Sequence, residues 1–237
     1  MDMISPSIAA LTPSLTLKVT NRAKAMKAAG EEVYGLAGGE PEMDTPDNIK
    51  QAAITALNNG ATKYTPSAGL PALRQAIADK LKRENNLEYD PSQITVGAGA
   101  KHACFNAIMA TVSEGDEVII PAPYWVSYPE MVRMCGGVPV IVETTPENGW
   151  KLTAEQFEEA MTPRTKMVIL TTPNNPTGAV YFEEELRALG EVAVSEDILI
   201  LADEIYEHLV YGDVKHVSIA SLSPELYDLT ITINGFS

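Results

Sequence analysis

The stretch "MVILTTPNNPTG", residues 167–178, passes abruptly from apolar to turn-forming residues. The run from Met167 to Leu170 is short and continuously apolar, as expected of a strand that is buried on both faces of a sheet. The prolines, asparagines and glycine that follow it form turns, and Asn175–Pro176 is a candidate for a cis peptide bond. Side-chain amides therefore stand where a strand leaves a sheet.

The same pattern of strand and turn recurs along the chain and alternates with helical patterns. Strands are predicted at 93–97, 116–120, 138–143, 165–171, 198–203 and 229–234, with helices at 100–112, 127–135, 153–161 and 182–195. Nearer the N-terminus the spacing predicts helices at 14–29, 46–60 and 70–85, and a short strand after residue 31. This alternation is typical of an α/β protein with a mostly parallel sheet and helices on both faces.

The composition excludes several classes of function. The 237 residues include 17 basic and 32 acidic ones, a net charge of −15, so we expect no binding to nucleic acid. No apolar run is long enough to cross a membrane. The N-terminus lacks the basic region of a signal peptide, and Cys104 and Cys135 are expected to be reduced, which predicts a cytoplasmic protein. The three histidines show no metal-ligand spacing, so no metal site is predicted.

Four strand ends carry residues suited to binding a ligand. Ligands of parallel sheets bind beyond the carboxyl ends of the strands. Gly97–Lys101 is a small-residue turn that opens a helix, and Trp125 follows the strand at 116–120. Asn175 follows the strand at 165–171. Asp203 comes directly after the apolar run at 198–202, and Tyr206 lies three residues further on. Each has a plainer interpretation as packing or turn formation when it is taken alone.

Taken together, these residues fit one molecule. A glycine-rich helix start favours a phosphate, an indole stacks on a flat ring, an amide and a phenol donate to an oxygen, and a lone carboxylate pairs with a basic nitrogen. Pyridoxal 5'-phosphate carries all four groups. The sequence therefore predicts this cofactor.

Several motifs, in order, carry a resemblance to a known family. They are "KYTPSAGLPALR" (63–74), "PYWVSYPEMV" (123–132), "PNNPTG" (173–178), "DEIYEHLVY" (203–211) and "NGFS" (234–237). From about Ser14 to Ser237 the chain resembles the fold-type I aminotransferases of class I/II, and most closely the bacterial aspartate and aspartate-prephenate aminotransferase subgroup. The resemblance implies an N-terminal segment and part of a small domain in 1–45, and an incomplete large cofactor-binding domain in 46–237.

The resemblance implies four contacts with the cofactor ring. Asp203 is similar to the acid that holds the proton of the ring nitrogen. Asn175 and Tyr206 resemble the donors to the phenolic oxygen, and Trp125 resembles the aromatic residue stacked on the ring face. Asp203 and Tyr206 are the implied catalytic residues. Trp125 and Asn175 are also implied to contact the substrate.

The phosphate contacts implied by the resemblance come from two subunits. Gly99, Ala100 and Lys101 match the phosphate-binding turn, and Ser237 matches a further phosphate contact. Tyr64 resembles a tyrosine that reaches the phosphate of the neighbouring subunit. We therefore expect a homodimer.

The same resemblance implies small-molecule substrates, an amino acid and a 2-oxo acid. Gly39 matches a backbone contact to the substrate α-carboxylate, and Thr16 and Lys101 are candidates for recognising a distal carboxylate. This favours aspartate or glutamate as donor and 2-oxoglutarate or oxaloacetate, with prephenate as a further candidate, as acceptor. Lys101 thus has two candidate roles, besides that of a solvated lysine at a helix start.

One feature of the family falls beyond the given sequence. The Schiff-base lysine of the family directly follows the "NGFS"-like stretch, and its carboxylate-binding arginine lies further on. We expect the residue after Ser237 to be a lysine modified by the cofactor and not written as a standard residue. The alternatives are a lyase with the same cofactor and fold, and a non-catalytic ligand-binding or regulatory domain. A generic nucleotide-binding domain would need a GxGxxG or Walker loop, which the sequence lacks.

Overall fold

The computed structural model of the chain describes residues 3–12, 15–36, 38–39 and 43–236. The chain divides into two compact units, one formed by Met1–Leu11 with Ser67–Ser237 and the other by Thr12–Pro66. The larger unit contains the sheet and is described first.

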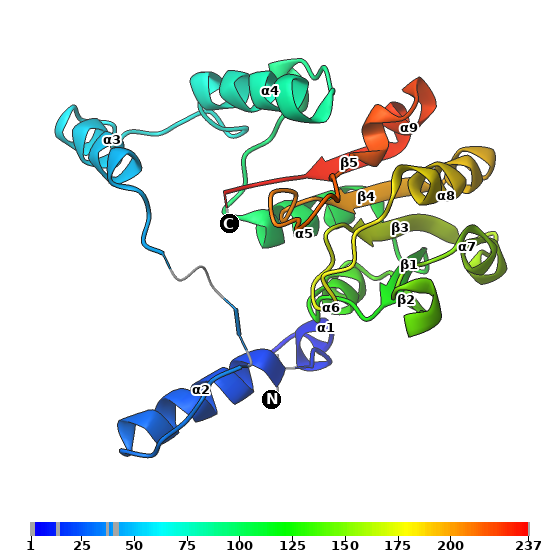
Figure 1. Cartoon of the computed structure of the whole chain (residues 1–237), viewed down its shortest axis with the longest axis horizontal. Coiled ribbons are helices and arrows are strands. Elements are labelled where there is room, and N and C mark those ends of the chain that lie inside the picture. Colours follow the sequence, from blue (N-terminus) through cyan, green and yellow to red (C-terminus); the bar gives the residue numbers. More distant parts are fainter. Residues whose placement is uncertain (1–2, 13–14, 37, 40–42, 237) are drawn as a thin grey trace. The chain divides into compact units, whose positions relative to one another are not determined.

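A five-stranded sheet forms the centre of the larger unit (Figure 1). Its strands are β1 (Glu117–Ala122), β2 (Val138–Glu143), β3 (Thr165–Thr171), β4 (Leu199–Asp203) and β5 (Thr230–Ile233). Their order is β2-β1-β3-β4-β5, and every neighbouring pair is parallel. The predicted α/β fold with a parallel sheet is therefore confirmed, and the strand at 165–171 has the predicted bounds.

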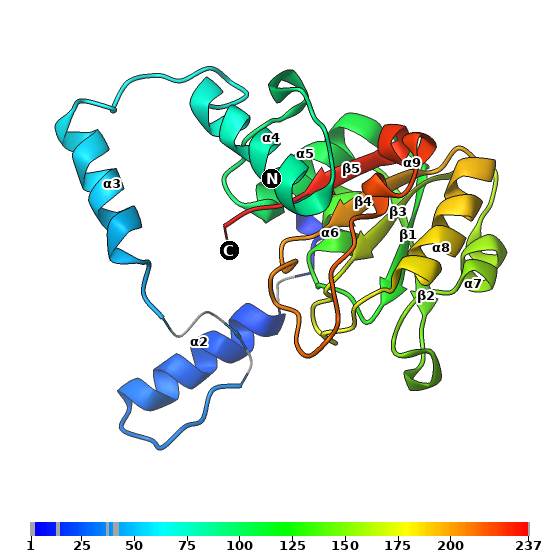
Figure 2. The same ribbon diagram turned by 45° about the horizontal axis from the view of Figure 1, so that its top comes forward.

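Helices cover both faces of this sheet, as predicted (Figures 1 and 2). One face is covered by α5 (Ala100–Thr111) and α6 (Tyr128–Met134), and the other by α7 (Ala154–Ala160), α8 (Glu183–Ser195) and α9 (Pro224–Leu229). The unit also contains α1 (Pro6–Ala9), α4 (Pro71–Asn85) and the short helices η1 (Pro91–Gln93), η2 (Pro146–Asn148) and η3 (Ile219–Ser221).

Alternate residues of each strand supply the two cores. Val168 and Leu170 of β3 pack with Leu186 of α8, whereas Met167 and Ile169 pack toward the helices on the opposite face. Both sets are almost fully buried. Because successive side chains of a strand point to opposite faces, a strand between two helical layers must be apolar throughout. This is why the run at 167–170 has no polar residue.

Local sequence signals account for the helix boundaries on the α7–α9 face. Thr153 accepts a hydrogen bond from the N–H of Gln156 and caps α7, and Ser223 caps α9 through the N–H of Leu226. Where α8 meets α9, a Cβ on Gly190 would lie 2.7 Å from a methyl carbon of Leu226. Glycine therefore permits the close approach of the two helices.

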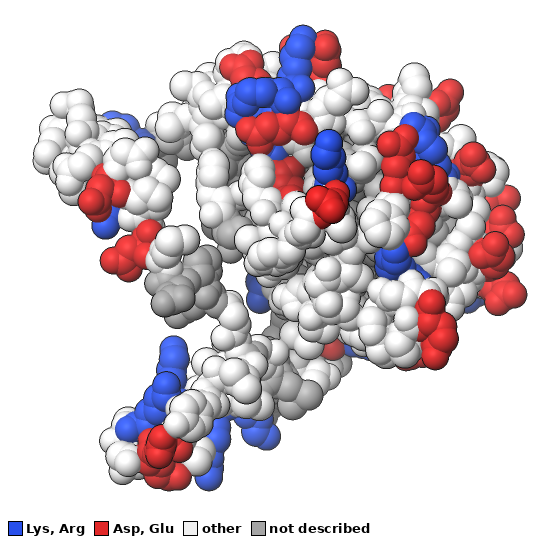
Figure 3. Space-filling view, in the orientation of Figure 1, with Lys and Arg blue, Asp and Glu red and all other residues white. Residues whose placement is uncertain are grey.

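Acidic residues lie on the outside of the same layer. The first turn of α8 consists of Glu183, Glu184 and Glu185, whose negative charges interact favourably with the positive end of the helix dipole. Acidic side chains gather over α7 and α8 in the space-filling view (Figure 3). This surface repels polyanions.

Two predicted strands are wrong. Residues 94–97 are irregular, and the Val96 N–H bonds to the carbonyl of Ala68, in a turn, instead of to a strand of the sheet. Gly69, at a φ of 104°, lets that turn pack directly against the Val96 side chain. Residues 31–36 also form no strand, because Tyr34 and Leu36 are exposed and no described strand lies beside them. The helix α9 was not predicted.

The smaller unit contains two helices, α2 (Leu15–Ala28) and α3 (Asp47–Asn58), close to the predicted bounds. Glycines in the left-handed region, Gly30 and Gly60, follow them. No residue of α3 is buried, and its apolar residues Ile49, Ile54 and Leu57 are about half exposed. Among all described residues, no helix is long and apolar enough to cross a membrane.

Truncating the core between α8 and the sheet should destabilise the fold. Leu186 is fully buried in that layer, so Leu186→Ala should lower the free energy of unfolding by about 2–5 kcal/mol, through lost burial and a residual cavity. Urea unfolding followed by circular dichroism measures this loss. Glu191→Ala, at an exposed position in the middle of the same helix, serves as the control and should change stability by less than about 0.5 kcal/mol.

Candidate functional site

The carboxyl ends of β1, β3 and β4 lie at one edge of the sheet, and direct hydrogen bonds link the segments that follow them. The N–H of Thr172 bonds to the carbonyl of Asp203 at 3.2 Å, which joins the ends of β3 and β4. The Asn174 side-chain amide donates to the Pro123 carbonyl at 3.2 Å, which joins the ends of β3 and β1. The structure thus brings three of the four predicted strand ends together.

Asp203 is the buried carboxylate of this edge. Its side chain is only 3% exposed, and it accepts three hydrogen bonds. The Tyr128 hydroxyl donates to Oδ2 at 2.6 Å, the Cys104 thiol lies 3.6 Å from the same oxygen, and the Ile205 N–H donates to Oδ1 at 3.2 Å. All three donors are neutral, and no ion pair involves Asp203 among the described residues.

The electrostatics of Asp203 follow from this environment. Burial raises the pKa of the carboxyl above its ordinary value of 3.8, although the bonds from Tyr128, Ile205 and Cys104 oppose the shift. A buried carboxylate without a cation is costly. A carboxylate offers about four acceptor positions, so Oδ1 retains one after its bond to Ile205. A cationic N–H of a ligand would use that position and offset the cost of burial.

The sequence reasoning missed Tyr128 and Cys104. Burial, followed by the adjacent charge of Asp203, raises the pKa of both the Tyr128 phenol and the Cys104 thiol, which keeps both groups protonated as donors at neutral pH. The Tyr128 hydroxyl also lies 2.9 Å from Thr171 Oγ1. The sequence signal for Tyr128 was its position three residues after Trp125, at the start of α6, which places both side chains close together.

Trp125 is half-buried and held from two sides. Its ring meets Tyr128 edge-on, with centroids 5.3 Å apart and planes at 84°. The Lys101 ammonium lies 4.9 Å from the indole centroid, which is cation–π geometry. Trp125 therefore connects the start of α5, which carries Lys101, to the residue that bonds Asp203.

The start of α5 is suited to an anion. Gly99 precedes the helix with a φ of 82°, and no side chain caps it. The N–H groups of Ala100 and Lys101 find no partner in the described part of the chain, while those of the next two residues bond back to the Gly99 carbonyl. Free amides at a helix start attract phosphate.

Asn175 and Tyr206 lie on the segments after β3 and β4, and both are half-buried. The Asn175–Pro176 bond is cis, as predicted. Neither side chain makes a hydrogen bond to another described residue, which leaves both polar groups available to a ligand.

The remaining predicted residues are not brought to this edge by any described contact. Thr16, Gly39 and Tyr64 belong to the smaller unit and are exposed. Ser237 lies outside the described residues. The roles implied for these four residues stay predictions.

Comparison with known protein families and sequences gives consistent matches. The family described as "Aminotransferase class I and II" matches residues 31–237. The chain is 55% identical, over 99% of its length, to the aspartate aminotransferase of Geobacillus stearothermophilus. Over its whole length it is 52% identical to the aspartate/prephenate aminotransferase of Cereibacter sphaeroides. It spans 60% of the length of each of these relatives.

Solved structures agree with these matches. The aspartate aminotransferase from Thermus thermophilus with maleate superimposes with a TM-score of 0.96 and 46% identity, over 100% of this chain and 61% of that one. The aspartate aminotransferase from Rhizobium meliloti gives a TM-score of 0.95 and 45% identity, over 99% of this chain and 59% of that one.

The raised pKa of Asp203 predicts a pH-dependent cost to the ligand-free fold. Folding favours the protonated carboxyl, so stability is lost as the pH rises from below 3.8 through the folded-state pKa. Asp203→Asn cannot ionise, and its free energy of unfolding should therefore improve relative to the wild type as the pH rises from about 4 to 7.

Urea unfolding across this pH range measures the difference between the two proteins. Asp79→Asn, at an exposed position of α4, is the control and should not reproduce the trend. A difference between Asp203→Asn and the wild type that stays constant or falls with rising pH would show that Asp203 ionises without cost.

Proposed function

The chain belongs to the class I and II aminotransferases, and from this premise we propose that it moves an amino group from an amino acid to a 2-oxo acid with pyridoxal 5'-phosphate as cofactor. The observation that carries the proposal is Asp203, a buried carboxylate whose donors are all neutral. Such a group fits the protonated ring nitrogen of this cofactor. A cytoplasmic location accords with the two free cysteines.

The other residues of the edge fit the remaining groups of the cofactor. The free amides of Ala100 and Lys101 suit its phosphate, and the half-buried indole of Trp125 suits its flat ring. Asn175 and Tyr206, which have no side-chain partner among the described residues, suit its phenolic oxygen. The residues present therefore match the group in charge, shape and donors.

The bound cofactor supplies an electron-accepting ring, and the chain's own residues maintain its protonation. Asp203 holds the proton of the ring nitrogen, because a cation beside the buried carboxylate stabilises both charges. Tyr128 and Cys104 donate to Oδ2 and hold that oxygen in place. Oδ1 accepts from the Ile205 N–H and keeps one acceptor position for the ring nitrogen. Tyr206 donates to the phenolic oxygen from the turn that follows Asp203.

The substrates in this proposal are dicarboxylic. The relatives are named as aspartate and aspartate/prephenate aminotransferases, and the neighbouring Thermus structure contains maleate, a dicarboxylate. Aspartate or glutamate is the donor, and 2-oxoglutarate, oxaloacetate or prephenate the acceptor. Gly39 is assigned to the α-carboxylate, and Thr16 and Lys101 to the distal one.

The active form in this proposal is a homodimer. In the smaller unit no residue of α3 is buried, and Tyr64 is fully exposed. A helix with exposed apolar residues on a soluble enzyme is expected to be covered by a partner. A second copy of the chain would cover it and would supply Tyr64 to the neighbouring phosphate.

Removing the carboxylate should abolish transamination and leave the fold intact. Asp203→Ala removes the group opposite the ring nitrogen, so turnover of aspartate with 2-oxoglutarate should fall by at least about 100-fold. Far-ultraviolet circular dichroism should stay unchanged. Asp79→Ala, on the surface of α4, is the control and should retain full turnover. Near-normal turnover of Asp203→Ala would defeat the assignment.

Mixing two inactive variants should restore activity if each site takes residues from both subunits. Tyr64→Ala and Asp203→Ala each damage every site of their own homodimer. A mixed dimer contains one site with both residues intact, so random reassortment should return about a quarter of the wild-type activity. Assay after co-expression measures this recovery. Activity no higher than the sum of the separate variants would place Tyr64 and Asp203 in the same subunit's site, or Tyr64 in none.

A further inference from the structure

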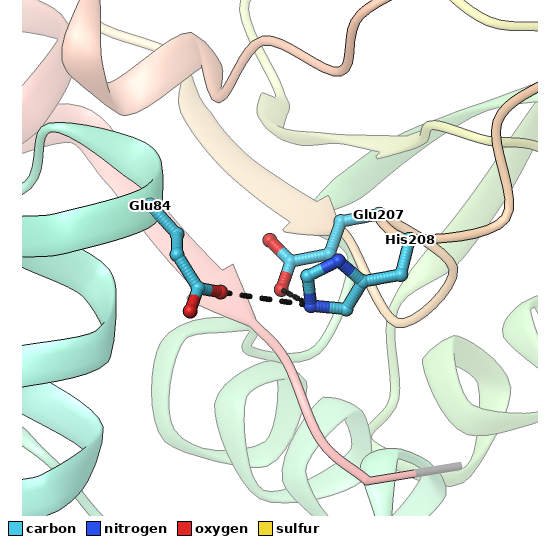
Figure 4. A group of neighbouring side chains, drawn as sticks. All are labelled: Glu84, Glu207 and His208. Atoms are coloured by element: carbon cyan, nitrogen blue, oxygen red, sulfur yellow. Dashed lines mark ion pairs between the residues drawn. The ribbon is translucent and has the colours of Figure 1, made fainter.

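The turn after β4 contains two more buried acids, Glu204 and Glu207, and the surroundings of Glu207 are unlike those of Asp203. The Glu207 side chain is 5% exposed, and in Figure 4 the ring of His208 faces both Glu207 and Glu84, with Nε2 at 3.3 Å and 3.6 Å from their carboxylate oxygens. The Lys80 ammonium forms an ion pair with Glu207 Oε1, and the Asn85 amide donates to Oε2 at 2.7 Å. Lys80 and Asn85 both belong to α4, more than 100 residues earlier in the chain. Glu207 therefore ties the turn to a distant helix.

Glu207 is a charged anchor. Burial raises its pKa, but the hydrogen bonds from Asn85 and Lys80, the nearby Asn234 amide and the charge of Lys80 together outweigh that effect, and the net shift is downward. The carboxylate is thus ionised at neutral pH and paired with a cation. A buried charge that loses one of its partners is strongly destabilising. The pairing with Lys80 and Asn85 therefore restricts the positions that the Glu207 side chain can take.

The turn is consequently fixed at both ends, and Tyr206 lies between them. At one end Asp203 is bonded by Tyr128 and Cys104, and its Oδ1 accepts from the Ile205 N–H. At the other end the Glu207 N–H bonds to the Glu204 carbonyl at 3.0 Å, within the turn. The Leu209 N–H bonds to the Tyr206 carbonyl at 2.7 Å.

Apolar packing does not replace this anchor on the far side of the turn. His208, Leu209 and Tyr211 are all exposed, so the chain leaves the core directly after Glu207. The Tyr206 side chain has no hydrogen bond to another described residue that could fix it. The position of this half-buried ring then follows from the backbone of the turn and from its packing.

We propose that Glu207 is a positioning residue that holds Tyr206 in place to donate to the phenolic oxygen of the cofactor, through its contacts with Lys80 and Asn85. The inference rests on the proposed function and adds to it a link from α4 to the cofactor-binding edge. It assigns Glu207 no contact with cofactor or substrate.

A spectroscopic double-mutant cycle on the full-length protein loaded with pyridoxal 5'-phosphate tests this role. The readout is the pH midpoint of the near-visible absorbance change of the bound cofactor, which depends on the donor to its phenolic oxygen. Tyr206→Phe should shift the midpoint by about 0.5 pH unit or more. Glu207→Ala should shift it in the same direction, and in the Tyr206→Phe background it should add no further shift.

Three more variants separate this role from a general loss of structure. Glu207→Gln keeps the side-chain length and one acceptor oxygen but loses the charge and the second acceptor, so it should shift the midpoint in the same direction as Glu207→Ala and by less. Glu84→Ala removes another acid near Lys80, 3.6 Å away and more exposed, and should leave the midpoint unchanged. If Glu207→Ala does not fold, Asn85→Ala, which removes one of the two contacts of the anchor and leaves the ion pair with Lys80, takes its place in the cycle.

The outcomes distinguish this inference from the proposed function. A wild-type protein that develops no near-visible absorbance with the cofactor overturns both. A shift in Tyr206→Phe together with an unshifted Glu207→Ala, or shifts that add in the double variant, overturns the positioning role alone.

Discussion

Asp203 is a carboxylate almost fully enclosed by protein, and its donors, a phenol, a thiol and a backbone amide, carry no charge. A structural acid in such a place is normally paired with a cation, because desolvation of an unpaired carboxylate is costly. In the function proposed above, the cation that pairs with Asp203 comes from a ligand. The arrangement of the surrounding residues becomes intelligible once a cationic ring nitrogen is placed opposite Oδ1.

The architecture explains how the residues around Asp203 are gathered. Parallel strands bring their carboxyl ends to one edge, and the helices that follow them begin there. The start of α5 with its free amides, Trp125 before α6, and Asp203 at the end of β4 are therefore neighbours, although they are distant in the sequence. The contact of Lys101 with Trp125, and of Trp125 with Tyr128, continues this arrangement to the carboxylate. Glu207 extends it to α4.

The sequence was most informative where local chemistry decides the structure. Apolar strands, caps and helical spacing predicted the parallel sheet, and the residue types at the strand ends predicted the polar groups that gather at one edge of it. The strand at 93–97 failed because its apolar pattern does not reveal that Val96 bonds to a turn at Ala68. Tyr128 and Glu207 were missed because their importance lies in partners far along the chain, Asp203 and Asn85. Such pairings depend on the fold and leave no periodic signal.

A crystal structure of the full-length protein with pyridoxal 5'-phosphate bound is the most direct test of this account. The account predicts one Asp203 carboxylate oxygen within about 2.6–3.2 Å of the pyridine nitrogen, in the ring plane. A ring whose nitrogen faces solvent or another residue, while Asp203 stays bonded only to Tyr128, Cys104 and Ile205, would contradict it.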